Sequence, residues 1–187
     1  MRKQLSIGLA ALSLTAAATI GMAQIKSMNL EEMVELADDS IHGQIVNHHV
    51  FRVDDPIDGP ELYFTTLTIE GTSMTSGDLM TVDVTFHGGF ISDTEGVYNS
   101  EAPSKDDILV GTPVVAFYRW QDNMGGGIAA NALSAAHGGL FRTIGGGDVE
   151  VVLGKGEGYA VDHNIMITDL SSAVERINKI KSNRQGK

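Results

Sequence analysis

Six histidines are the side chains of this sequence best suited to binding a transition metal, at positions His42, His48, His49, His87, His137 and His163. None of them forms the i, i+4 helical pair of a zinc protease, and adjacent histidines on a strand point to opposite faces. His87 and His137 each precede Gly-Gly at an expected strand end, so their imidazoles would meet if those strands paired. A pair of ligands falls short of a zinc site. We therefore expect no bound metal, with His87 and His137 as weak candidates only.

A second weak candidate is an acidic segment whose oxygen ligands would suit calcium. It carries four carboxylates, on Asp54, Asp55, Asp58 and Glu61. Gly59 stands where a calcium loop begun at Asp54 needs glycine, but Pro56 and Thr65 occupy the third and twelfth ligand positions. Because turns favour Asp, Gly and Pro in any case, we interpret this segment as a solvated turn, with an adventitious calcium site as the alternative.

The motifs of common catalytic sites are incomplete. Residues 71–75 begin like the Gly-x-Ser-x-Gly turn of serine hydrolases, but Thr75 replaces the closing glycine. Gly154-Lys155 lacks the upstream glycine and the following Ser or Thr of a phosphate-binding loop. The absence of cysteine excludes thiol nucleophiles, thiolate metal sites and disulfides. We therefore predict no catalytic residue and no cofactor.

Charge and length narrow the class of protein further. The 187 residues include 13 basic and 24 acidic side chains, for a net charge of −11. A nucleic-acid-binding protein needs a cationic surface, so no nucleic acid is expected as a partner. The length suits one domain with an accessory segment.

The N-terminus has the pattern of a secretory signal. Arg2 and Lys3 precede an apolar run over 5–20, and the small residues of Gly21-Met22-Ala23 predict cleavage before Gln24. We expect a signal peptide at 1–23, a single β-barrel domain at 24–187, and no membrane insertion after cleavage. The protein should be periplasmic or extracellular. Export without cysteine favours a bacterial source.

Hydrophobic periodicity predicts a mainly β chain between two helices. Asn29 and Glu32 form a capping box before a short helix, and a second helix is expected at about 168–182. Strands are expected between these helices at 40–52, 62–70, 80–87, 113–120, 129–136, 140–144, 149–153 and 159–162. Short strands with glycine corners indicate a small OB-like antiparallel β-barrel, with a β-sandwich as the alternative.

The order of these segments resembles a known type of protein. A helix running into a strand over 30–46 is followed by strands at 63–69 and 82–89 and by the late segment 139–143. This order resembles a loose group of exported bacterial proteins of unassigned function and, more distantly, the OB-like barrel of netrin-type modules and tissue inhibitors of metalloproteases. The resemblance implies the fold. The inhibitors bind zinc through an N-terminal cysteine, so their mechanism does not carry over to a chain without cysteine.

These observations favour an exported, non-catalytic binding or interaction module. Recognition is expected from the loops at 54–61, 90–107 and 121–127, and the partner would be another exported protein or a small ligand. One alternative is a secreted hydrolase, which a cleft holding His87, His137 and an acid would favour. Another is a structural subunit of an envelope assembly.

Overall fold

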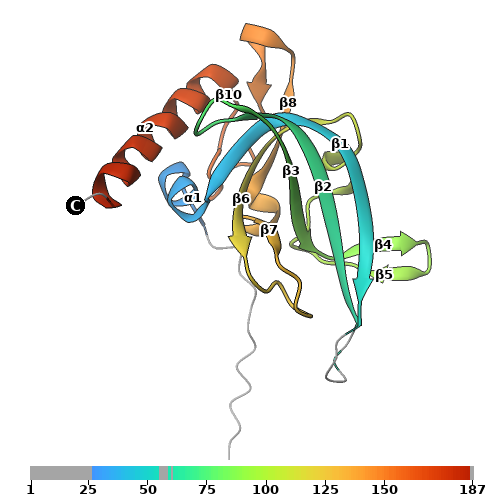
Figure 1. Ribbon diagram of the computed structural model, residues 1–187. Helices are drawn as coiled ribbons and strands as arrows, with labels where there is room; N and C mark the ends of the chain where they lie inside the picture. Colours follow the sequence, from blue (N-terminus) through green and yellow to red (C-terminus); the bar gives the residue numbers. More distant parts are fainter. Residues whose placement is uncertain (1–26, 55–58, 60, 186–187) are drawn as a thin grey trace, which may run out of the picture.

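The computed structural model describes residues 27–54, 59 and 61–185 (Figure 1). The expected signal peptide at 1–23 lies outside the described residues. Within the part of the chain that is described, no helix is long and apolar enough to cross a membrane. The elements in chain order are α1 (Leu30–Leu36), β1 (Asp39–Val53), β2 (Leu62–Ser73), β3 (Leu79–His87), β4 (Gly89–Ser92), β5 (Glu95–Val97), η1 (Lys105–Asp107), β6 (Pro113–Gln121), β7 (Ala130–Leu133), η2 (Ala136–Gly139), β8 (Leu140–Ile144), η3 (Gly147–Val149), β9 (Val151–Val152), β10 (Ile165–Met166) and α2 (Ile167–Gln185).

Strands β1, β2, β3, β7 and β6 form a closed barrel in that order, because β6 pairs back onto β1. This is the strand order of an OB-type barrel, and it confirms the predicted fold rather than the β-sandwich alternative. One of the five seams, between β3 and β7, is parallel. An odd number of strands cannot alternate in direction all the way around a closed barrel, so at least one parallel seam is unavoidable.

The first strand is long enough to serve two neighbours. Its residues 39–44 pair with β6, while residues 41–53 pair with β2. Gly43 of β1 pairs with Gly71 of β2, and a Cβ on either would lie 2.1 Å from a backbone oxygen of the other strand. Larger residues would therefore push the two strands apart at this point.

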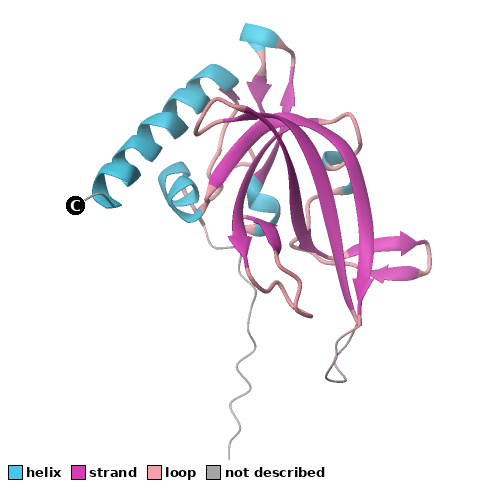
Figure 2. Cartoon of the chain, in the orientation of Figure 1, coloured by secondary structure: helices cyan, strands magenta, loops and turns pink. Residues whose placement is uncertain are grey.

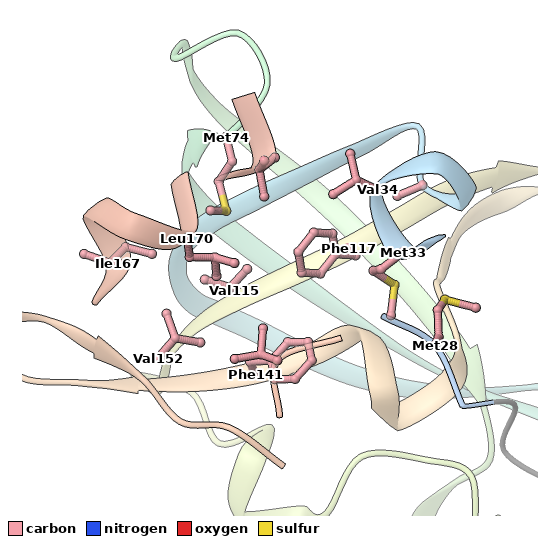
Figure 3. Packing of buried hydrophobic residues seen from close by; sticks show 13 residues of the cluster. Met28, Met33, Val34, Met74, Val115, Phe117, Phe141, Val152, Ile167 and Leu170 are labelled. Atoms are coloured by element: carbon pink, nitrogen blue, oxygen red, sulfur yellow. The ribbon is translucent and has the colours of Figure 1, made fainter. Parts of the chain in front are cut away.

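Alternate residues of the barrel strands fill two large cores, and a smaller third cluster contains Phe64, Met124 and Ala132. One core lies inside the barrel. The other lies between the outer wall and the helices, and Figure 3 shows its side chains gathered there. It contains Met28, Met33, Val34, Ala37, Met74, Val115, Phe117, Phe141, Val152, Val161, Ile167, Leu170 and Val174. The two helices thus cover part of the barrel wall on one side (Figure 2).

Hydrogen bonds from side chains stabilise both ends of α1. The predicted capping box is present, since the Asn29 side chain accepts from the Glu32 amide and the Glu32 carboxylate accepts from the Asn29 amide. At the other end of α1, the Lys181 ammonium of α2 donates to the carbonyls of Val34 and Ala37. A cation there satisfies carbonyls that the helix leaves free.

Several predicted segments differ from the structure. The strand expected at 129–136 ends at Leu133, and residues 159–162 form no strand; the last strand is instead β10. The expected polar loop at 90–107 contains the β4–β5 hairpin and the η1 turn (Figure 1). The elements that the sequence pattern missed are only two to four residues long, and over so few residues periodicity does not distinguish a strand from a turn.

Candidate functional site

A pocket of about 220 Å³ opens in the barrel wall at β3, β6 and β7, and none of its lining residues belongs to α1 or α2. Its walls come from the ends of β3 and β6, from β7, and from the loops that follow β5 and β6. The lining residues are Thr85, Phe86, His87, Asn99, Glu101, Ala102, Arg119, Gln121, Met124, Ala132, Leu133, Ala135 and Ala136. Two of the three loops expected to carry recognition, 90–107 and 121–127, thus meet here.

The strand register determines which side chains surround the pocket. Ala132 of β7 pairs with Thr85 of β3 on one side and with Arg119 of β6 on the other. A small residue between two larger neighbours leaves room on the wall. Arg119 and Gln121 follow Val115 and Phe117 on the same face of β6, beyond the part of that face which the second core covers.

Hydrogen bonds attach the loop after β5 to the rest of the wall. The Asn99 side-chain amide donates to the carbonyl of His87 at 3.0 Å, and its oxygen accepts from the Glu101 amide at 2.9 Å. The carbonyl of Glu101 in turn accepts from the His137 amide at 2.8 Å. These bonds fix the backbone of Glu101 at the rim and leave its carboxylate free.

The backbone of the pocket wall is strained at two successive residues. Ala135 and Ala136 have φ of 50° and 52°, and they alone among the non-glycine residues of the described chain have positive φ. They belong to the segment 134–139, which leaves the sheet between β7 and β8 while both strands pair with β6. Left-handed alanine costs about 1–2 kcal/mol per residue, and such strain concentrates at functional sites.

Three ionisable side chains line the pocket without partners. Within the described residues, the side chains of Arg119, Glu101 and His87 form no hydrogen bond or ion pair, so Arg119 and Glu101 are not within 4.0 Å of each other. The His87 ring lies 4.8 Å from that of Phe64. Desolvation lowers the pKa of His87 below 6.5, and this outweighs the attraction of the Glu101 carboxylate. At neutral pH His87 is therefore mainly uncharged.

A row of rings extends from the pocket across the outer wall. His87 of β3 contacts Phe64 of β2, which stacks on Phe51 of β1, which stacks on His49. Phe64 is fully buried, because the loop after β6 packs Met124 over it. The row makes a rigid support for the His87 side of the pocket.

His87 and His137 were expected to meet only if their strands paired, and His137 lies in η2 rather than on a strand. The His137 imidazole hydrogen-bonds the Tyr159 hydroxyl at 2.9 Å, and His137 is not among the lining residues. Its carbonyl accepts from Lys155 at 2.6 Å, while desolvation lowers the pKa of that lysine. His137 therefore joins the late loop to the wall, and the acid beside His87 is Glu101.

The acidic segment is described only in part, because Asp55 and Asp58 lie outside the described residues. Glu61 accepts hydrogen bonds from Arg52 and from the Tyr63 hydroxyl, both at 3.3 Å. Asp54 is exposed. The described residues hold no group of three or more His, Cys, Asp or Glu side chains arranged for a metal ion.

Reasoning from sequence did not identify Arg119 or Glu101 as site residues. The sequence indicated Glu101 only as a member of the expected recognition loop at 90–107. It indicated Arg119 only as a basic residue that follows the apolar stretch of the strand expected at 113–120. No protein-family model, curated protein or solved structure matches this chain.

Proposed function

We propose that this protein is an exported binding module that holds a small polar ligand in the pocket on the barrel wall. The observation that carries the proposal is the set of unpartnered Arg119, Glu101 and His87 side chains around one concavity. Convergent polar groups in a pocket with an apolar lining are the usual features of a ligand site. The strain at Ala135 and Ala136 supports the same location.

The arrangement favours binding over catalysis. Thr85 carries the only hydroxyl among the lining residues, and its oxygen is 2.9 Å from the Thr66 hydroxyl in a buried pair. A nucleophile in an acyl-transfer site is instead held by a general base. The loop serine Ser73 likewise has a structural role, since its hydroxyl donates to the Asp39 carboxylate and accepts from two turn amides.

The volume of the pocket limits the size of the ligand. An apolar cavity of about 150 Å³ holds benzene, whereas drug-sized ligands fill about 300–1,000 Å³. A pocket of about 220 Å³ therefore suits a molecule of roughly ten non-hydrogen atoms. A macromolecular partner would use the pocket only for one projecting side chain.

A fragment screen by NMR tests this proposal. We expect fragments of roughly ten non-hydrogen atoms to shift the amide signals of Thr85, Glu101 and Arg119 saturably. The signals of Val174 in the helix-covered core should not move. If no fragment shifts the pocket signals saturably, or if the shifts occur elsewhere, the pocket is not a binding site.

Export is tested separately, because the N-terminus lies outside the described residues. The chain expressed with its own N-terminus in a bacterial host should appear in the periplasm or medium, and N-terminal sequencing should begin at Gln24. A product that starts at Met1 and stays in the cytoplasm would contradict this part of the proposal.

A further inference from the structure

We propose that the ligand of this pocket is a small zwitterion that has a carboxylate, a primary ammonium group and an apolar body. This inference rests on the proposed binding function and assigns its ligand class. Arg119 would receive the carboxylate, Glu101 would receive the ammonium group, and the alanine and methionine side chains of the wall would contact the body.

Arg119 is suited to a carboxylate by its chemistry and its position. The guanidinium is always charged and offers a planar fork of donors that matches two carboxylate oxygens. The residue is half-buried and comes from β6, next to Ala132 in the register. No carboxylate of the described chain pairs with it, whereas Arg52 pairs with Glu61 and Glu95, and Arg184 pairs with Glu31 and Glu35.

Glu101 supplies the opposite charge from a different segment. The Glu101 amide donates to the Asn99 side chain and the Glu101 carbonyl accepts from the His137 amide. These two bonds fix the backbone from which the Glu101 carboxylate extends. It forms no ion pair with Arg119, and both residues line the same pocket, so one ligand in the pocket would meet both charged groups. His87 is mainly neutral at pH 7 and does not act as a second cation competing for Glu101.

The opposed charges discriminate between ligand classes. A simple carboxylate bound at Arg119 would desolvate Glu101 without pairing it, and an amine bound at Glu101 would do the same to Arg119. A buried charge without a partner is costly, so each singly charged ligand is penalised. Only a zwitterion satisfies both groups. The side chains of Met124, Ala102 and Ala132 in the lining are apolar and would contact the remaining part of the ligand.

Three compounds of nearly the same shape test the inference on the unmodified protein. L-leucine has both charges, 4-methylpentanoate lacks the ammonium group, and 3-methylbutylamine lacks the carboxylate. Each is titrated at pH 7 with NMR detection of the pocket amides. We expect L-leucine to bind about 10- to 100-fold more tightly than either analogue, since each loses one charge-assisted contact. Equal affinity for L-leucine and an analogue would overturn the inference.

Matched variants identify the groups that receive each charge. Arg119→Gln and Glu101→Gln should each weaken L-leucine binding about 10- to 100-fold. Arg176→Gln and Glu157→Gln, at exposed positions away from the pocket, should leave it unchanged. Glu101→Gln should also reduce the preference for L-leucine over 4-methylpentanoate. If this preference is unchanged, Glu101 does not receive the ammonium group and the assignment is wrong.

The outcomes separate the ligand class from the binding function. If L-leucine causes no pocket shift while uncharged or singly charged fragments bind there saturably, the zwitterion assignment fails and the binding function stands. If neither L-leucine nor any fragment shifts the pocket signals, both fail. The comparison of L-leucine with its two analogues uses the unmodified protein, so it tests the inference even if a variant does not fold.

Discussion

The same face of β6 has two different surroundings along its length. At Val115 and Phe117 it is fully buried beneath helices and late strands, and Phe117 meets Phe141 edge to face with ring centroids 6.2 Å apart. At Arg119 and Gln121 it lines a pocket with free polar groups. The first region is arranged for stability. The second keeps charged groups unpaired and backbone strained, which costs stability and leaves the groups available to a ligand.

The largest expected effect is a difference in the free energy of unfolding between substitutions at Phe117 and at Arg119, which lie two residues apart on β6. Phe117→Ala should lower the free energy of unfolding by about 3–5 kcal/mol, because it leaves a cavity between sheet and helices. Arg119→Gln should change it by less than about 0.5 kcal/mol, because the Arg119 side chain forms no hydrogen bond or ion pair within the described residues. Urea denaturation measures both. A loss of stability in Arg119→Gln as large as in Phe117→Ala would show that the pocket wall is part of the packed structure.

The packed side also contains a buried polar cluster. Glu150 is a buried residue, and its carboxylate accepts hydrogen bonds from Thr143 and from His42, whose nitrogen lies 2.9 Å away. Thr143→Val should therefore lower the free energy of unfolding by about 1–3 kcal/mol. Thr68→Val, which removes a hydroxyl bonded to Asp83 at an exposed position, is the matched control and should cost less. If Thr143→Val and Thr68→Val lowered the free energy of unfolding equally, burial would not strengthen the hydrogen bond between Thr143 and Glu150.

The hydrogen-bonded Glu150 carboxylate should also make the free energy of unfolding depend on pH in the acidic range. Desolvation raises the pKa of Glu150, but the hydrogen bonds from Thr143 and His42 outweigh it and hold the pKa below 4.5. The stabilisation is therefore complete above pH 4.5 and is lost as the pH falls through the lower folded value. Glu150→Gln should flatten this part of a plot of unfolding free energy against pH. An unchanged acid slope in Glu150→Gln would contradict this account.

A smaller effect of opposite sign is expected at the strained turn. Ala136→Gly should raise the free energy of unfolding by about 0.5–1 kcal/mol, because glycine adopts positive φ without the alanine penalty. Ala173→Gly within α2 is the control and should lower it by about 1 kcal/mol. Thermal denaturation distinguishes the two signs. If Ala136→Gly destabilises as much as the control, the turn does not store strain.

The smallest effect concerns His87. Its pKa below 6.5 in the folded protein means that the unfolded chain takes up a proton first, so stability should fall slightly as the pH drops below 6.5. An NMR titration of the imidazole carbon protons measures the folded value directly. Glu101→Gln should lower the pKa of His87 further, because the carboxylate attracts the imidazolium. A folded pKa at or above 6.5 would contradict the account in which desolvation of the ring outweighs the attraction of the Glu101 carboxylate.

Much of the fold was predictable from local pattern. Val82, Val84 and Phe86 alternate with polar residues, and they line the barrel interior. The capping box at Asn29 and Glu32 is encoded within four consecutive residues. Because such patterns report which face of a strand or helix avoids water, they determine elements and fold class without knowledge of distant partners.

The predicted acid and histidine sites show where this reasoning ends. His87 and His137 share a local signal, Gly-Gly after a strand, yet only His87 lines the pocket. The difference depends on β7 ending at Leu133 and on the strained excursion after it. The segment 134–139 is too short to show a hydrophobic periodicity, so its backbone path could not be predicted from the sequence.

The sequence by itself determined the mainly β character, the positions of the helices, and the classes of chemistry that a chain without cysteine cannot perform. Only the tertiary structure decided which polar groups meet. Glu150 and His42 lie 108 residues apart in the chain, and Glu101 reaches the neighbourhood of Arg119 only through barrel closure and loop attachment. Whether a residue is buried depends on which face of its strand or helix it occupies, and the hydrophobic periodicity of the sequence records that face. A site depends on strand register between distant segments, which no local pattern records.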